Sequence, residues 1–254
     1  MPRHGRATGG VDRRPALGFG VVVPPAVAVL PQPPLLVPEL AGSAATETAD
    51  LRAACVEAAR RLAAVTTTWI AVGADAGGRR TAGPDVRGTF AGFGVDVVVG
   101  LDPGATAPVD PELPLPLLVA GWAAGPVGAR VRGELVAPDL PPEECAALGR
   151  ALAGEGAGLL VVGDGAATHT EKAPGHLDER AGPFDAAVAA ALGTGDAAAL
   201  AALDPDLAAQ LWAVGRAPWQ VLAGATAGAA WRAELLHSSA PYGVAYHVAV
   251  WTPS

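Results

Sequence analysis

Short, mostly apolar runs alternate with segments of helical periodicity along most of the chain, and this alternation restricts the fold more than any other feature. The apolar runs cover residues 26–30, 67–72, 96–99, 115–119, 158–162 and 243–251. Helical spacing occurs in 51–65, from 142 onward, and in 184–192, 197–203, 206–214 and 218–227. Continuous apolar strands between helices are typical of parallel sheets with both faces covered. We therefore predict an α/β fold, a single domain with a central, mostly parallel sheet covered by helices on both faces.

Local signals refine this prediction at three places. Proline inside the run 115–119 places that strand at an edge of the sheet, because proline cannot donate to a ladder. Asp204 and Pro205 are typical of a helix start, with Asp as the cap and Pro at the first position. The Gly/Pro-rich stretch 75–88 is predicted to be a long loop, and loops of this length are often functional or mobile.

The first residues differ in composition from the rest of the chain. Residues 1–16 contain four arginines among Gly, Pro and Thr and few apolar side chains, so we predict a disordered tail there and a folded domain over 17–254. A secretory signal peptide is the alternative. It is disfavoured because Pro24 and Pro25 interrupt the apolar stretch that follows, and no small-residue cleavage site comes after it.

Charge and cysteine content exclude several classes of partner. The net charge of −8 argues against nucleic-acid binding, which requires a basic face. No apolar run approaches the roughly 20 residues that cross a bilayer. Cys55 and Cys145 both fall in helix-like patterns, so we predict two reduced core cysteines and a cytoplasmic protein.

Lys172 is the single lysine beside sixteen arginines, and it lies in the densest polar stretch of the sequence. Where composition favours arginine so strongly, a retained lysine indicates a place where a compact ammonium is needed. Asp164, His169, Glu171 and His176 crowd the same segment. The alternative is a lysine that lies on the surface by chance. Likewise, the turn 163–165 is compatible with a phosphate cradle, but no complete nucleotide-binding motif follows it.

Polar groups follow three of the predicted strands. Gln32 comes after the first strand, Asp75 after the second, and Asp164 with His169 after the strand 158–162. Because ligands of such sheets bind beyond the carboxyl ends of the strands, we expect these groups to line one site. His237 and His247 are expected to be structural.

Several segments together resemble a known family, the class III extradiol ring-cleavage dioxygenase superfamily, of the type that includes the Memo-like proteins. The similarity spans about residues 22–251 and is closest to an uncharacterised actinobacterial branch. Its carrying segments are 31–38, 163–165, 171–175, 177–178, 183–185, 215–220 and 240–244. The resemblance implies aromatic ring opening by a non-haem Fe(II) that two histidines and a carboxylate hold.

The resemblance also assigns roles to residues. Gln32 and the region of Asp75 occupy the places where the family has histidine ligands, and Glu234 is matched to the carboxylate. This oxygen-only set, Gln32, Asp75 and Glu234, favours Mg²⁺ or Mn²⁺ over Fe(II), or no metal at all. We therefore expect a degenerate metal site.

The remaining candidate residues surround that site. His169 is matched to the general acid/base, with Asp164 and Lys172 as further catalytic candidates and Lys172 holding an anionic group. Gln32, Glu171 and His176 are the predicted substrate-binding residues.

Three hypotheses stay open at this point. The chain is a dioxygenase-like enzyme, or a non-catalytic member that binds a metabolite or a protein, or a protein in which Glu171 and Lys172 form a purely structural ion pair. The expected partner is an aromatic or anionic small molecule, and a homo-oligomer is left open.

Overall fold

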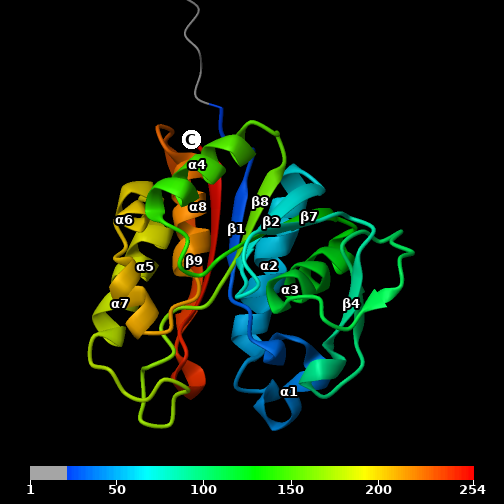
Figure 1. Cartoon of the computed structure of the whole chain (residues 1–254), viewed down its shortest axis with the longest axis horizontal. Helices are drawn as coiled ribbons and strands as arrows, with labels where there is room; N and C mark the ends of the chain where they lie inside the picture. The colour runs from blue at the N-terminus through cyan, green and yellow to red at the C-terminus, as the bar shows by residue number, and fades with distance from the viewer. Residues whose placement is uncertain (1–21) are drawn as a thin grey trace, which may run out of the picture.

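The structure is a computed structural model that describes residues 22–254, so the predicted tail over residues 1–16 lies outside the described part. Its centre is a seven-stranded sheet (Figure 1). In spatial order the strands are β3 (Arg80–Ala82), β7 (Arg130–Val136), β2 (Thr68–Ala74), β8 (Gly158–Val162), β1 (Val27–Leu30), β10 (Tyr246–Pro253) and β9 (Trp231–Ser239). The four strands β7, β2, β8 and β1 run parallel, whereas β3 and β10 are antiparallel to their neighbours. The predicted α/β class with a mostly parallel sheet is confirmed.

Helices cover both faces of this sheet, as predicted (Figure 1). One face carries α2 (Ala49–Val65) and α3 (Leu115–Ala124), and the short α1 (Pro38–Ala41) lies on the same side. The other face carries α4 (Pro142–Ala153), α5 (Ala181–Thr194), α6 (Ala197–Ala201), α7 (Pro205–Gln210) and α8 (Arg216–Thr226). Short 3₁₀ turns occupy Pro34–Leu36, Gly42–Ala45, Phe90–Phe93, Gly125–Val127 and Pro241–Gly243.

The alternation of side chains along each strand explains why both faces are buried. In β1, Val27 and Val29 pack into the core under α4, α5 and α8, whereas Ala28 and Leu30 pack into the core under α2 and α3. All four residues of β1 are buried. A strand that is apolar at every position is what a sheet covered on both sides requires.

The run 115–119 was predicted as an edge strand, and this prediction is wrong. The run begins α3, which starts after Pro114 and has proline in its first turn, where the missing N–H costs nothing. Nearly every residue of α3 is buried, so its sequence shows no polar face and looks like a strand. Pro116 packs so closely on β2 that a Cβ on Gly73 would overlap its ring.

Other boundaries also differ from the predictions. The run 96–99 contributes to β5 (Val98–Gly100), which pairs with β4 (Arg87–Thr89) in a separate three-stranded sheet completed by β6 (Val109–Asp110). The predicted loop 75–88 contains β3. Strands β7 and β9 were missed: β7 carries the Arg132–Glu134 ion pair, and β9 is a half-exposed outer strand.

Glycine allows α4 and α8 to cross at very short distance. A Cβ on Gly149 would overlap the carbonyl oxygen of Val221, and one on Gly224 would lie 2.5 Å from that of Ala146. Cys145 on α4 and Cys55 on α2 are buried and free, as predicted. Within residues 22–254, no helix has the length and apolar character to cross a bilayer.

Candidate functional site

A cavity of 740 Å³ opens at the carboxyl ends of the parallel strands, the edge of the sheet where the sequence predicted a site. Gln32 follows β1, Asp164 follows β8, and Pro138 and Asp139 follow β7. Much of the wall is apolar and includes Pro33, Pro34, Leu35, Leu115, Ala167, Pro174, Ala208, Ala209, Ala213, Val214 and Val244. Such a cavity, apolar with a few polar groups, is typical of small-molecule sites.

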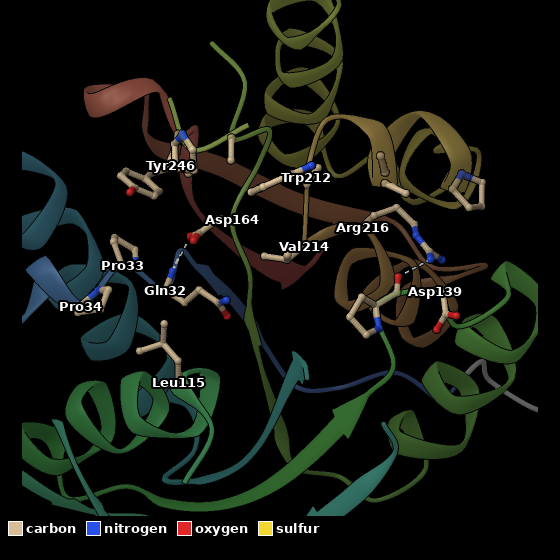
Figure 2. A pocket seen from close by; sticks show the side chains of 18 of the residues that line it. Gln32, Pro33, Pro34, Leu115, Asp139, Asp164, Trp212, Val214, Arg216 and Tyr246 are labelled. Atoms are coloured by element: carbon tan, nitrogen blue, oxygen red, sulfur yellow. Dashed lines mark hydrogen bonds between the residues drawn. The ribbon is translucent and has the colours of Figure 1, made fainter. Parts of the chain in front are cut away.

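Asp164 is the polar group at one end of the cavity (Figure 2). Its Oδ1 accepts a hydrogen bond of 2.7 Å from the backbone N–H of Gln32, which joins the ends of β1 and β8. Burial raises the pKa of Asp164 to about 7, and the Gln32 hydrogen bond opposes this rise. Within the described chain no arginine, lysine or histidine pairs with this carboxyl. Asp164 can therefore gain or lose a proton near neutral pH.

Gln32 extends its amide into the wall beside Leu115 (Figure 2). The Oε1 atom is buried and has no hydrogen-bond partner among residues 22–254. Burial of an amide oxygen without a hydrogen-bond partner costs free energy. The described residues therefore leave one acceptor in the cavity wall without a donor.

Arg216 lines the opposite end of the cavity, with Trp212 and Val214 between it and Asp164 (Figure 2). The Arg216 guanidinium is buried and donates to the carbonyl oxygens of Leu140 at 2.6 Å and Pro138 at 2.5 Å. Burial lowers its pKa. These bonds fix the loop after β7 and so shape the cavity at this end.

Trp212 combines exposure with an unusual backbone conformation. Its side chain lines the cavity, yet the residue is 56% exposed, and its φ of 56° lies in the left-handed region. His176 and Tyr242 are the other non-glycine residues described with positive φ. Strained backbone of this kind persists where surrounding contacts impose it, and it is common at ligand sites.

His169 lies outside the cavity lining, in a buried network of polar side chains. Its Nε2 is 2.6 Å from Oδ2 of Asp185 on α5, and Nε2 of His247 on β10 is 3.1 Å from Oδ1 of the same carboxylate. Because a carboxylate only accepts, both histidines donate from Nε2. The Nδ1 of His247 is then free to accept from the Ser238 hydroxyl at 3.0 Å.

This network joins four segments of the chain. The backbone N–H of Ala166 also donates to Asp185, so the loop after β8, helix α5 and strands β9 and β10 meet at one carboxylate. The expectation of a structural His247 agrees with this geometry. His169 is half-buried and held by Asp185, behind the wall to which Ala167 and Pro174 contribute.

The structure brings together only some of the predicted site residues. Gln32 and Asp164 line the cavity, and His169 is close in sequence to its wall. The other loop candidates, Glu171, Lys172 and His176, are exposed and lie outside the lining. No ion pair between Glu171 and Lys172 is present among the described residues.

The predicted metal ligands do not meet. Glu234 lies on β9, paired with Val250 of β10, and forms an exposed ion pair with Arg61 at 2.6 Å, whereas Gln32 lies beyond the carboxyl end of β1. Asp75 accepts a hydrogen bond from the N–H of Gly77 in its own turn. In the part of the chain from 22 to 254, no three His, Cys, Asp or Glu side chains are placed to hold a metal. The residues present therefore do not fit the Fe(II) site that the resemblance implies, because Glu234 pairs with Arg61 on the outer strand β9, away from Gln32. The sequence could not place Glu234 because strand β9 was not predicted.

Sequence reasoning also missed several residues of the wall. Asp139 follows the unpredicted strand β7, and Leu115 lies on the helix that was taken for a strand. Arg216 was not among the predicted site residues, yet it begins α8 and lines the cavity.

Comparison with known proteins leaves the family open. No protein-family model and no curated protein sequence matches the chain. Among solved structures, an uncharacterized protein, JW3007, from Escherichia coli K12 is similar, with 14% sequence identity and a TM-score of 0.47. The match covers 89% of this chain and 99% of that protein.

Proposed function

We propose that the chain binds a small organic molecule in the 740 Å³ cavity, with an apolar body against the walls and a polar group at Asp164. The observation that carries this proposal is a half-buried carboxyl without a protein counter-charge in the described chain, which stands at one end of an apolar cavity. Proteins rarely leave such a group uncompensated, and a ligand that fills the cavity would both cover the apolar wall and satisfy Asp164.

The ring-cleavage activity stays a prediction from the resemblance. The Gln32, Asp75 and Glu234 side chains are not assembled into one site, so no described observation favours iron-dependent oxygen chemistry over binding. Of the three sequence-based hypotheses, binding of a metabolite is the one that the cavity supports best.

A cavity-filling substitution tests this proposal. Val214 lies in the wall between Asp164 and Arg216, and Val214→Trp would occupy the middle of the cavity (Figure 2). The matched control is Val65→Trp at the exposed end of α2, where the added ring meets solvent. Both variants and the wild type are screened against a fragment library by ligand-observed NMR.

Fragments that bind the wild type and Val65→Trp should lose binding to Val214→Trp, because the indole takes the space that their apolar bodies need. A thermal-unfolding measurement without ligand checks whether Val214→Trp is folded. Fragments that bind all three proteins equally, or a screen without any binder to the wild type, would refute a ligand site in this cavity.

A further inference from the structure

We infer that the occupant of this cavity carries a protonated amine, whose ammonium group contacts the carboxylate of Asp164, on an apolar body. The inference rests on the proposed function and specifies its ligand. It replaces the anionic ligand that the sequence suggested through Lys172. That lysine is exposed and outside the cavity lining, so it cannot meet an anion bound there.

The first argument is the missing counter-charge at Asp164. One oxygen of the carboxyl accepts from the Gln32 backbone, and the other has no hydrogen-bond partner within residues 22–254. A carboxylate removed from water is stabilised strongly by a cation in contact with it. An ammonium group supplies both the positive charge and the N–H donor that the free oxygen lacks.

The second argument is the charge of the remaining wall. Asp139 and Asp206 also line the cavity, so within residues 22–254 three carboxyl groups of the lining face one basic side chain, Arg216. That guanidinium is already engaged with carbonyl oxygens and with Gln220. The cavity therefore favours a cation, and the chain's net charge of −8 favours the approach of one.

An aromatic side chain also lines the cavity. Trp212 borders the same cavity as Asp164 (Figure 2), and the face of an indole ring attracts ammonium groups. The titratable groups whose pKa responds to Asp164 are Tyr246 of β10 and Cys55 of α2. Burial raises the pKa of both, and because a phenol or a thiol is either neutral or anionic, neither supplies a positive charge to Asp164.

Three probes with one common body separate the ligand classes: cyclohexylmethylamine, cyclohexylmethanol and cyclohexanecarboxylate. Binding to the wild type is followed by NMR titration at about pH 8, where Asp164 is ionised. We expect the amine to bind at least about ten-fold more tightly than the alcohol, the size expected for one charge-assisted hydrogen bond, and the carboxylate to bind most weakly.

The pH dependence adds a second readout. Protonation of Asp164 below about pH 7 should weaken binding of the amine by about ten-fold or more at about pH 5, while binding of the alcohol changes little. Asp164→Asn should reduce the affinity for the amine to that for the alcohol. The matched control, Glu171→Gln, removes one charge from an exposed position outside the cavity lining and should retain the affinity of the wild type.

Two results would overturn the inference. If the alcohol or the carboxylate binds the wild type as tightly as the amine, or if the amine fails to bind while other library fragments do, the cavity binds ligands of another class and the proposed function survives. If no fragment binds at all, the proposed function fails together with the inference. The probe series uses the wild type alone, so these outcomes do not depend on how the variants fold.

Discussion

Asp164→Asn should stabilise the protein, and the gain should depend on pH. The folded-state pKa of about 7 exceeds the ordinary value of 3.8, so the fold favours the protonated carboxyl. Below about pH 4 the carboxyl is neutral in both the folded and the unfolded state, so its protonation does not reduce the free energy of unfolding. As the pH rises from about 4 to about 7, the unfolded state loses this proton more easily than the folded state, and the free energy of unfolding falls. At 1.36 kcal/mol per pH unit the loss is up to about 4 kcal/mol.

Asp164 is only partly buried, so solvent screens its charge and the loss of stability lies at about 2 to 4 kcal/mol. Asparagine has the same shape and its Oδ1 can keep the hydrogen bond from Gln32, but it carries no charge to desolvate. The free energy of unfolding of Asp164→Asn should therefore exceed that of the wild type by this amount at about pH 8. The two should differ little at about pH 4.

Urea denaturation of both proteins at these two pH values measures the effect. For a chain of this size, 1 kcal/mol corresponds to roughly 2–4 °C in Tm, so thermal unfolding provides an independent check. Asp139→Asn, at an exposed carboxyl, should show no comparable pH-dependent gain. A difference between Asp164→Asn and wild type that is the same at both pH values, or a loss of stability at about pH 8, would show that Asp164 is not desolvated as described.

Three further substitutions test other parts of the structure. Asp185→Asn should lower the free energy of unfolding by about 2 to 4 kcal/mol in urea denaturation, because the amide has one oxygen and can accept from only one of the two histidines that donate to this carboxylate. Gly149→Ala should lower the free energy of unfolding by about 3 kcal/mol or more, because the new Cβ would overlap the Val221 carbonyl oxygen. Gly154→Ala, at the end of the same helix, should change the free energy of unfolding little, because the nearest atom to its Cβ is 3.4 Å away. Equal losses in urea denaturation of the two variants would contradict the close crossing of α4 and α8. Lys172→Ala should change the free energy of unfolding by less than about 0.5 kcal/mol and leave fragment binding unchanged, because the lysine is exposed and outside the cavity lining. A clear loss of fragment binding would show that Lys172 contributes to the site after all.

The fold class could be predicted because the buried strands are apolar at every position. β1 and β8 each carry five or fewer residues, all buried, between helical segments, and few architectures besides a doubly covered sheet produce that pattern. The same pattern failed for α3, because a helix buried on all sides also lacks polar positions. Strand β7 was missed for the opposite reason. Its sequence contains charged residues, as a solvent-facing segment would, but in the structure Arg132 and Glu134 form an ion pair with each other.

The edge of the sheet at which the cavity opens could be predicted, but most of the residues that line the cavity could not. Gln32 and Asp164 could be found because the carboxyl ends of parallel strands share one edge of the sheet, and in this sheet β1 and β8 are direct neighbours. The loop after β8 could not be placed, because long-range hydrogen bonds determine its course. The N–H of Ala167 donates to Leu211, and that of His169 donates to Gly243. These partners lie more than forty residues away in the sequence. The local sequence around Lys172 therefore could not predict which of its polar side chains line the cavity.

The position of β10 has a consequence for how the molecule acquires its fold. This strand lies between β1 and β9, and Val27 pairs with Trp251, so β1 gains its second neighbour only after more than two hundred further residues have been synthesised. Until then one edge of β1 offers unpaired N–H and C=O groups to other chains. Ladders between such distant segments form slowly. On the ribosome the sheet therefore remains incomplete until late, and aggregation in that interval competes with insertion of the strand that carries Tyr246 and His247.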